Sequence, residues 1–306
     1  MRHNRTYGYH NAKWRDYSVP FILFCVVCWV LGYQLNIGYP VFAEVSSTPL
    51  WNYLTLIMPG KLVVYLIGFG LTLGGAFLLQ RANFELGLIR ERNHLPFLFY
   101  LLLVSIHIDF IPINASSLGV FFLIIALYEL FSSYHYPNRV GKAFNASFLI
   151  GAGSLFWIQI VWLLPLFWYG MYRFRSFSLK SIIASLLGIL TVYWLLLGWC
   201  VWTKDFTLLA LPFESLAKFN VLSFDFSLFT HQLIPLLILF LSVMAIINLL
   251  SNEYEDNIVT REFMWFIVLL FFFSIFLYLL YGSEQEEFLQ MSCVPASILI
   301  SRFASV

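Results

Sequence analysis

The sequence contains few charged residues. Asp, Glu, Lys and Arg make up 11% of its 306 residues, whereas an ordinary soluble domain has about 25%. Hydrophobic residues make up 61%, well above the roughly 45–50% of such a domain. The 17 basic and 16 acidic side chains nearly cancel, so no basic excess points to nucleic acid. The composition excludes an ordinary soluble domain and predicts an integral membrane protein.

Cysteines and recognisable motifs are also scarce. The sequence has four cysteines, and two of them, Cys25 and Cys28, lie inside a continuous apolar run. Zinc or redox chemistry would require polar surroundings and a partner pair, so we interpret both as small packing residues. The sequence contains no P-loop, dinucleotide-binding, zinc-protease or Ser-His-Asp pattern. It therefore identifies no cofactor and no metal.

Long apolar runs dominate instead. A helix of about 20 apolar residues crosses the hydrocarbon core of a bilayer. On this basis we expect spans at residues 18–35, 61–79, 94–111, 118–131, 181–202, 232–250 and 263–281. The last apolar piece, 288–300, is too short to cross and is expected to be a half-span or part of an incomplete final helix. The predicted fold is all-α: a single membrane domain over residues 1–306, built as a helical bundle with about 8–9 membrane segments.

Basic residues set the predicted orientation. The N-terminal tail, residues 1–17, is basic, which places it in the cytoplasm. With this orientation most of the 17 Lys and Arg fall in cytoplasmic segments, while Lys61, Lys204 and Lys218 remain on the outer side. We therefore expect a multi-pass protein of the bacterial inner membrane.

The outer segment 204–230 has a pattern of its own. Within residues 213–219, Glu214 and Lys218 lie four positions apart, and apolar residues occupy the other helical face. This pattern predicts a short helix that lies in the outer interface.

The most informative run extends from Ala146 to Tyr172 and contains no charged residue. It is too long for one crossing and too short for two. Basic residues bracket it: Arg139 and Lys142 precede it, and Arg173, Arg175 and Lys180 follow it. Both ends are therefore expected on the cytoplasmic side, which predicts a re-entrant or broken helix pair. Gly151, Gly153 and Pro165 are the candidate break points.

Two acidic residues lie within apolar spans. Asp109, with His107 two residues before it, is near the outer end of one span, and Glu129 is near the cytoplasmic end of the next. Ionisable groups in a membrane usually face a cavity or a partner, so Asp109 is a catalytic candidate. On a continuous helix His107 and Asp109 would point about 200° apart, so we expect them not to share a face. The simpler interpretation is that Asp109 reaches the outer interface and Glu129 extends to water.

Glu44 is the only acidic residue of the first outer loop, within Tyr39-Pro-Val-Phe-Ala-Glu-Val. A carboxylate at this place would serve as a general base or a metal ligand for a lipid-linked substrate. The alternative is a solvated loop residue.

The region from Arg92 to Ile189 carries a family resemblance. A span that ends in a polar and basic loop is followed by Phe-Asn-Ala-Ser-Phe, by the aromatic-rich broken stretch and by an Arg-containing loop. This order resembles an uncharacterised family of polytopic inner-membrane proteins common in Bacteroidota, over about a third of the chain. The resemblance implies a location and no established activity.

More distantly, the order of elements is similar to membrane glycosyltransferases of the GT-C type, which take sugars from polyprenyl-phosphate carriers. Those enzymes have short paired membrane segments, outer interfacial helices and a catalytic acid in the first outer loop, which Glu44 matches by position. The resemblance implies that Lys204 or Lys218 contacts the carrier phosphate and that the broken stretch forms a wall of the lipid groove. Glu44 departs from the family pattern because no second acid stands beside it.

Three functions compete at this point. The first is a GT-C-like protein that handles a polyprenyl-linked sugar at the outer face. The second is a non-catalytic subunit or scaffold that binds other envelope membrane proteins, and the third is a transporter, for which only Asn145 and Gln159 offer polar groups. The candidate residues are Glu44 and Asp109 for catalysis, and His107, Lys204 and Lys218 for substrate binding.

Overall fold

The computed structural model describes residues 15–35, 48–58, 60–90, 93–136, 139–219, 229–252, 256–282 and 285–305. These ranges are mostly helical, with short turns between the helices, and contain no β-strand, which confirms the all-α prediction. Within them, five helices are long and apolar enough to cross a membrane: α3 (Lys61–Leu86), α8 (Leu179–Thr203), α10 (Phe229–Ser251), α11 (Ile258–Leu280) and α12 (Gln285–Ser305). The chain thus has the helices of a multi-pass membrane protein.

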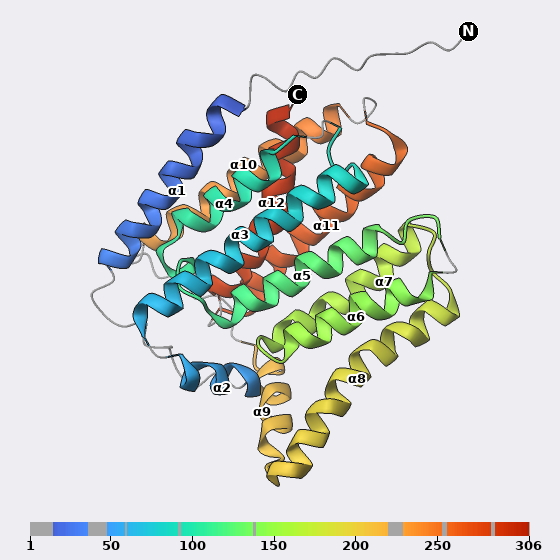
Figure 1. The fold of residues 1–306 in the computed structure, drawn as a ribbon. Coiled ribbons are helices and arrows are strands. Elements are labelled where there is room, and N and C mark those ends of the chain that lie inside the picture. The colour runs from blue at the N-terminus through green and yellow to red at the C-terminus, as the bar shows by residue number, and fades with distance from the viewer. Residues whose placement is uncertain are drawn as a thin grey trace.

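Further α-helices complete the bundle (Figure 1). They are α1 (Arg15–Leu35), α2 (Pro49–Ile57), α4 (Leu95–Ile106), α5 (Ala115–Phe131), α6 (Val140–Ser154), α7 (Leu163–Arg173) and α9 (Thr207–Leu216). Two 3₁₀ turns, η1 (Ile108–Phe110) and η2 (Ile158–Trp162), interrupt the helices. Figure 1 shows most helices running alongside one another, with α2 and α9 together at one end of the bundle.

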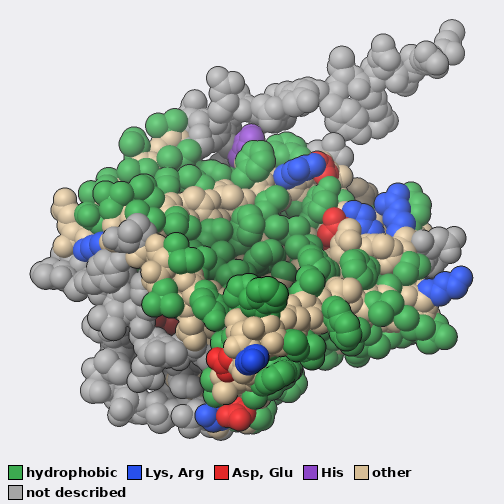
Figure 2. Space-filling view, turned by 60° about the horizontal axis from the view of Figure 1, so that its bottom comes forward, with side chains coloured by type: hydrophobic (Ala, Val, Ile, Leu, Met, Phe, Trp, Pro, Cys, Tyr) green, Lys and Arg blue, Asp and Glu red, His purple; other side chains and the backbone are tan. Residues whose placement is uncertain are grey.

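The bundle has two chemically different ends. We call the end where α6 begins and α7 ends the basic end, because Arg139, Lys142, Arg173, Arg175 and Lys180 lie there. The other end, with α2 and α9, we call the distal end. Figure 2 shows a surface that is mostly hydrophobic, with the visible Lys and Arg side chains in a few small groups separated by wide hydrophobic areas. This distribution matches a bundle whose middle lies in lipid.

Helix α12 is the central helix of the bundle. It packs against α4, α5, α10 and α11. It is the least apolar of the five candidate spans and the most enclosed, with 83% of its span buried. The hydroxyls of Ser292 and Ser297 donate to backbone carbonyls of the same helix at 2.7 Å, so their polarity is satisfied internally.

The prediction that the piece 288–300 is too short to cross was wrong, because this piece is part of α12, which extends from Gln285 to Ser305 and is long and apolar enough to be a candidate span. Its polar residues Gln290, Ser292, Ser297 and Arg302 are buried in protein. Near its last turn, Arg302 is paired with Asp256, with 2.8 Å between Arg302 Nε and Asp256 Oδ2. Both side chains are almost fully buried, at 3% and 4% exposure. A hydropathy pattern does not reveal a span of this kind, because its partners lie elsewhere in the sequence.

Helices α6 and α8 show that the chain doubles back between them. Gly188 of α8 faces the backbone of Phe144, and Val192 faces Gly151, so the two helices run in the same direction. The backbone amide of His135, just before α6, donates to the carbonyl of Phe174, just after α7, at 3.0 Å. The stretch from α6 to α7 therefore leaves the basic end and returns to it.

The break within this stretch lies beyond the predicted glycines. Gly151 and Gly153 are inside α6, where a Cβ atom would be 3.1 Å from Val192 Cγ2 and 3.2 Å from Phe122 Cβ, respectively. The helix ends at Ser154, so both glycines serve close packing and do not break it. Pro165 lies in the first turn of α7, where its missing N–H removes no helical hydrogen bond.

The contact between α6 and α8 can be tested at Gly188. A Cβ atom on Gly188 would lie 2.5 Å from the carbonyl oxygen of Phe144, which is backbone and does not move aside cheaply. We expect Gly188→Ala to lower the free energy of unfolding by about 1–3 kcal/mol, measured by thermal unfolding in detergent. Gly198→Ala is the matched control, because nothing lies within 4 Å of that position on the same helix. Equal stability of both variants would contradict this packing.

Candidate functional site

The strongest candidate site lies at the distal end, where the chain leaves α4. Helix α4 ends at Ile106, His107 is extended, and Asp109 lies in the 3₁₀ turn η1. This break turns the two side chains toward each other, with 3.5 Å between His107 Nδ1 and Asp109 Oδ2. The prediction that they do not share a face was wrong, because it assumed a continuous helix.

Burial differs sharply between the two groups. The His107 side chain is 6% exposed and stacks on the ring of Phe110, with 4.3 Å between ring centroids. The Asp109 side chain is 38% exposed. The pair therefore consists of a buried imidazole and a partly exposed carboxylate beside it.

Polar side chains fix the turn that carries this pair. Asn114 caps α5, because its Oδ1 accepts from the backbone amide of Ser117 at 2.8 Å and Ser117 Oγ accepts from the Asn114 amide in return. The hydroxyl of Ser116 donates to Gln290 Oε1 at 2.6 Å, which joins α5 to α12. The cap at the start of α5 thus fixes the turn after α4, and the hydrogen bond from Ser116 to Gln290 fixes α5 to the central helix α12.

Two more acids approach this turn from α12. Glu286 and Glu287 occupy the first turn of α12, where a helix N-terminus favours negative charge. Glu286 lies close enough to Asp109 for the two charges to interact. Among the residues that the structure describes, no group of three or more His, Cys, Asp or Glu side chains is placed to hold a metal ion. The site is acidic and has no metal-binding geometry in this part of the chain.

Tyr281 connects this region to the rest of the distal end. Its hydroxyl accepts from Trp162 Nε1 at 2.8 Å and donates to the carbonyl of Leu216 at 2.6 Å. Its ring stacks on Phe288, with 5.4 Å between centroids. The end of α11 therefore joins η2, the end of α9 and the beginning of α12. The sequence gives no signal for this role, since a tyrosine at the end of a span is common.

Both candidate lysines lie at the distal end and are exposed. Lys204 ends α8 in a left-handed conformation with φ of 58°, and Lys218 follows α9. The predicted short helix of this segment exists but is shifted: α9 covers Thr207–Leu216 rather than 213–219. Lys218 is beyond its last residue, so the prediction that Glu214 and Lys218 share one helical face is wrong. The structure places both lysines at the same end as Asp109 without bringing either into contact with it.

The remaining sequence candidates have different outcomes. Glu44 lies outside the described residues. Glu129 does not simply extend to water, because its Oε2 is 2.9 Å from Lys142 Nζ at the basic end. Asn145 is exposed on α6 and Gln159 is buried in η2, so they do not form a common polar site. All four cysteines are free thiols; Cys25, Cys200 and Cys293 are buried, and Cys28 is partly exposed.

No protein-family model, curated protein or solved structure matches the chain. Its own chemistry is therefore the basis for a functional proposal.

The hydroxyl of Tyr281 provides a test of how the distal end is assembled. In Tyr281→Phe the Trp162 indole and the Leu216 carbonyl both lose their partner, so we expect a stability loss of about 1–3 kcal/mol. The end of α9 should also become more accessible to protease. Tyr278→Phe is the control. Tyr278 lies near the end of α11, and its hydroxyl makes no hydrogen bond to any residue that the structure describes. If both variants resist protease equally well, Tyr281 does not hold α9.

Proposed function

We propose that this protein is a GT-C-like inner-membrane protein that acts on a polyprenyl-phosphate-linked sugar at its distal end. The observation that carries the proposal is the His107–Asp109 pair, which is built at a helix break and presents a carboxylate to the surface. Intramembrane ionisable groups are expensive, and a fixed, partly exposed one is a candidate for chemistry.

The proposed orientation follows from the basic end. Lys and Arg are retained on the cytoplasmic side of membrane proteins, so the basic end would face the cytoplasm and the distal end the outside. The N-terminus is then cytoplasmic. The α6–α7 stretch would enter the membrane and return to the same side, giving about 8–9 membrane segments in total.

The proposed chemistry needs a base, a phosphate contact and a wall for the lipid. Asp109 would take the proton of an acceptor hydroxyl, whose oxygen attacks the anomeric carbon of the sugar. The bond from that carbon to the carrier phosphate breaks, and the polyprenyl phosphate leaves with the electron pair. His107 would orient Asp109 and contact the sugar, while Lys204 or Lys218 would contact the phosphate. Glu44 is the alternative base or metal ligand.

Three features of the distal end favour a lipid-linked substrate. Helices α2 and α9 both lie at this end, where interfacial helices could border an opening to lipid. The turn between α6 and α7 reaches the same region, since Trp162 contacts Tyr281. This turn contains buried Ile158, Gln159 and Ile160 and no charged group, so it suits a wall rather than a reacting centre.

The proposal is tested with the full-length protein in lipid vesicles that contain a polyprenyl-phosphate-linked, radiolabelled hexose and a membrane extract as acceptor. We expect transfer of label and release of polyprenyl phosphate by the native protein. Asp109→Asn should lower the rate about 10²–10⁴-fold, as loss of a general base does. Glu214→Gln, which changes an exposed acid on α9, is the control and should keep the native rate.

Two results would change this proposal. If Asp109→Asn keeps the native rate while Glu44→Gln abolishes transfer, Glu44 is the base. If the folded native protein transfers no sugar, the hypothesis that it is an enzyme fails. The alternative, a non-catalytic scaffold, then takes its place. The observation that favours a scaffold is α8, which is only 33% buried and exposes Trp194, Trp199 and Trp202. Crosslinking from this face should then recover a second membrane protein.

A further inference from the structure

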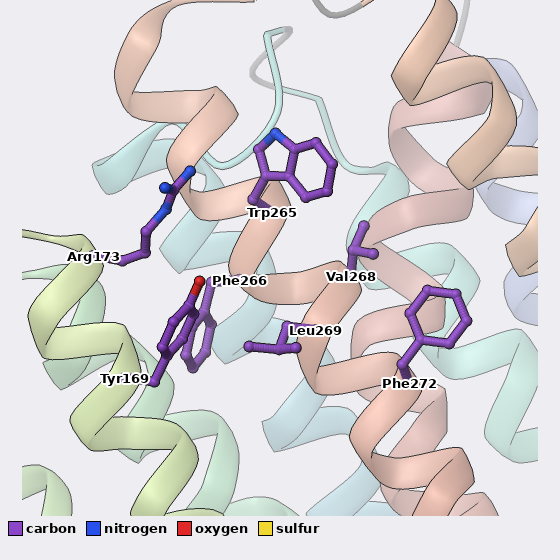
Figure 3. A pocket seen from close by; sticks show the side chains of 7 residues that line it. All are labelled: Tyr169, Arg173, Trp265, Phe266, Val268, Leu269 and Phe272. Carbon is purple, nitrogen blue, oxygen red and sulfur yellow. The ribbon is translucent and has the colours of Figure 1, made fainter.

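A groove of about 470 Å³ lies between α7 and α11, beginning near the basic end (Figure 3). It is separate from the distal site, because α7 ends and α11 begins at the basic end. Its lining includes Tyr169 and Arg173 from α7, and Trp265, Phe266, Leu269 and Phe272 from α11.

The floor of the groove is rigid and apolar. Gly170 lets α7 approach α11 closely, since a Cβ atom there would be 2.6 Å from Phe266 Cε2. Phe266 is fully buried and packs against Phe131 and Phe174, with centroids 5.7 and 5.6 Å away. The walls are open to the surroundings, because Leu269 and Phe272 are both exposed. The groove is thus a fixed apolar channel on the lipid-facing surface.

The groove has a cationic end and an apolar end. Arg173 lies at the cationic end, 42% exposed, with its Nε 2.8 Å from Glu262 Oε2. This contact uses Nε, and among the described residues the two terminal nitrogens of the guanidinium have no hydrogen-bond or ion-pair partner. Phe272 lies ten residues after Glu262 on α11, about 15 Å along the helix. Figure 3 shows the guanidinium of Arg173 and the indole nitrogen of Trp265 in the upper part of the groove and Phe272 in the lower part.

We propose that this groove binds an anionic phospholipid from the leaflet at the basic end. The headgroup phosphate contacts the terminal nitrogens of Arg173, which suit two-point binding of phosphate oxygens. Trp265 lies at headgroup level, as interfacial tryptophans do. One acyl chain follows the groove along Leu269 to Phe272.

Charge complementarity favours a lipid over a partner helix. The other basic residues of this end, including Arg175 and Lys180, raise the local concentration of anionic headgroups. An apolar partner helix would fill the lower groove but offer no acceptor to the terminal nitrogens of Arg173, which the Nε contact with Glu262 does not use. An anionic phospholipid has a headgroup for the cationic end of the groove and an acyl chain for its apolar end. This inference does not depend on whether the distal site is catalytic.

Native mass spectrometry of the detergent-purified full chain, titrated with phosphatidylglycerol or phosphatidylcholine of equal acyl chains, tests this site. We expect the native protein to prefer phosphatidylglycerol. Arg173→Gln should weaken phosphatidylglycerol binding about tenfold, the effect of losing a direct hydrogen bond between charged groups. Glu262→Gln should strengthen it, because Arg173 loses its competing carboxylate. Leu269→Trp should weaken both lipids by filling the groove.

The controls separate a built site from diffuse attraction. Lys180→Gln removes the same charge at the same end without touching the groove. Because the detergent-purified protein has no membrane surface in which Lys180 could concentrate anionic headgroups, this variant should keep near-native affinity. The double variant Arg173→Gln/Glu262→Gln removes the ion pair without leaving a half-buried acid, and it should lose the preference for phosphatidylglycerol while remaining folded. Equal weakening by Lys180→Gln and Arg173→Gln would overturn the site. So would a dimer mass that Leu269→Trp converts to monomer, since a second copy would then be the occupant.

Discussion

A peptide chain that leaves its helix inside a membrane protein must find other partners for its backbone amides and carbonyls, because lipid offers none. The turn between α6 and α7 meets this constraint in two ways. Its own amides bond locally, as when Trp157 N donates to the Gly153 carbonyl at 2.9 Å. The rest is covered by protein: Thr48, beside α2, donates to the carbonyl of Phe156 at 2.8 Å. Helix α9 also packs against η2 of this turn, and α2 packs against α9.

The central helix follows a related rule. Helix α12 carries serines, Gln290, two acids and an arginine, a composition that a lipid-facing span does not tolerate well. Its neighbours exclude lipid, and its serine hydroxyls bond within the helix. The same polar side chains then organise both ends of the bundle. Gln290 holds α5 at the distal end, and Arg302 holds the segment before α11 through Asp256.

The sequence predicts the lipid-facing parts of this protein well and the enclosed parts poorly. Spans such as α8 and α11 are evident because their apolar length reflects the thickness of a bilayer. The doubling back at residues 146–172 was predicted from flanking charge, and the parallel course of α6 and α8 agrees with it. The full length of α12, which makes it a candidate span, was missed because a helix buried inside protein can carry polar residues that weaken its hydropathy signal. Contact between His107 and Asp109 was missed because it depends on where α4 ends, and the sequence marks that boundary only weakly.

The account depends most on the doubling back of the chain between α6 and α7. Cysteine accessibility tests it directly, in a background where the four native cysteines are replaced. Single cysteines are introduced as Tyr136→Cys before α6, Phe177→Cys after α7 and Lys204→Cys at the distal end, all at exposed positions. A membrane-impermeant maleimide applied to intact cells should label Lys204→Cys alone, and permeabilised cells should allow labelling of the other two. Labelling of Tyr136→Cys and Phe177→Cys from opposite sides of the membrane would contradict the account.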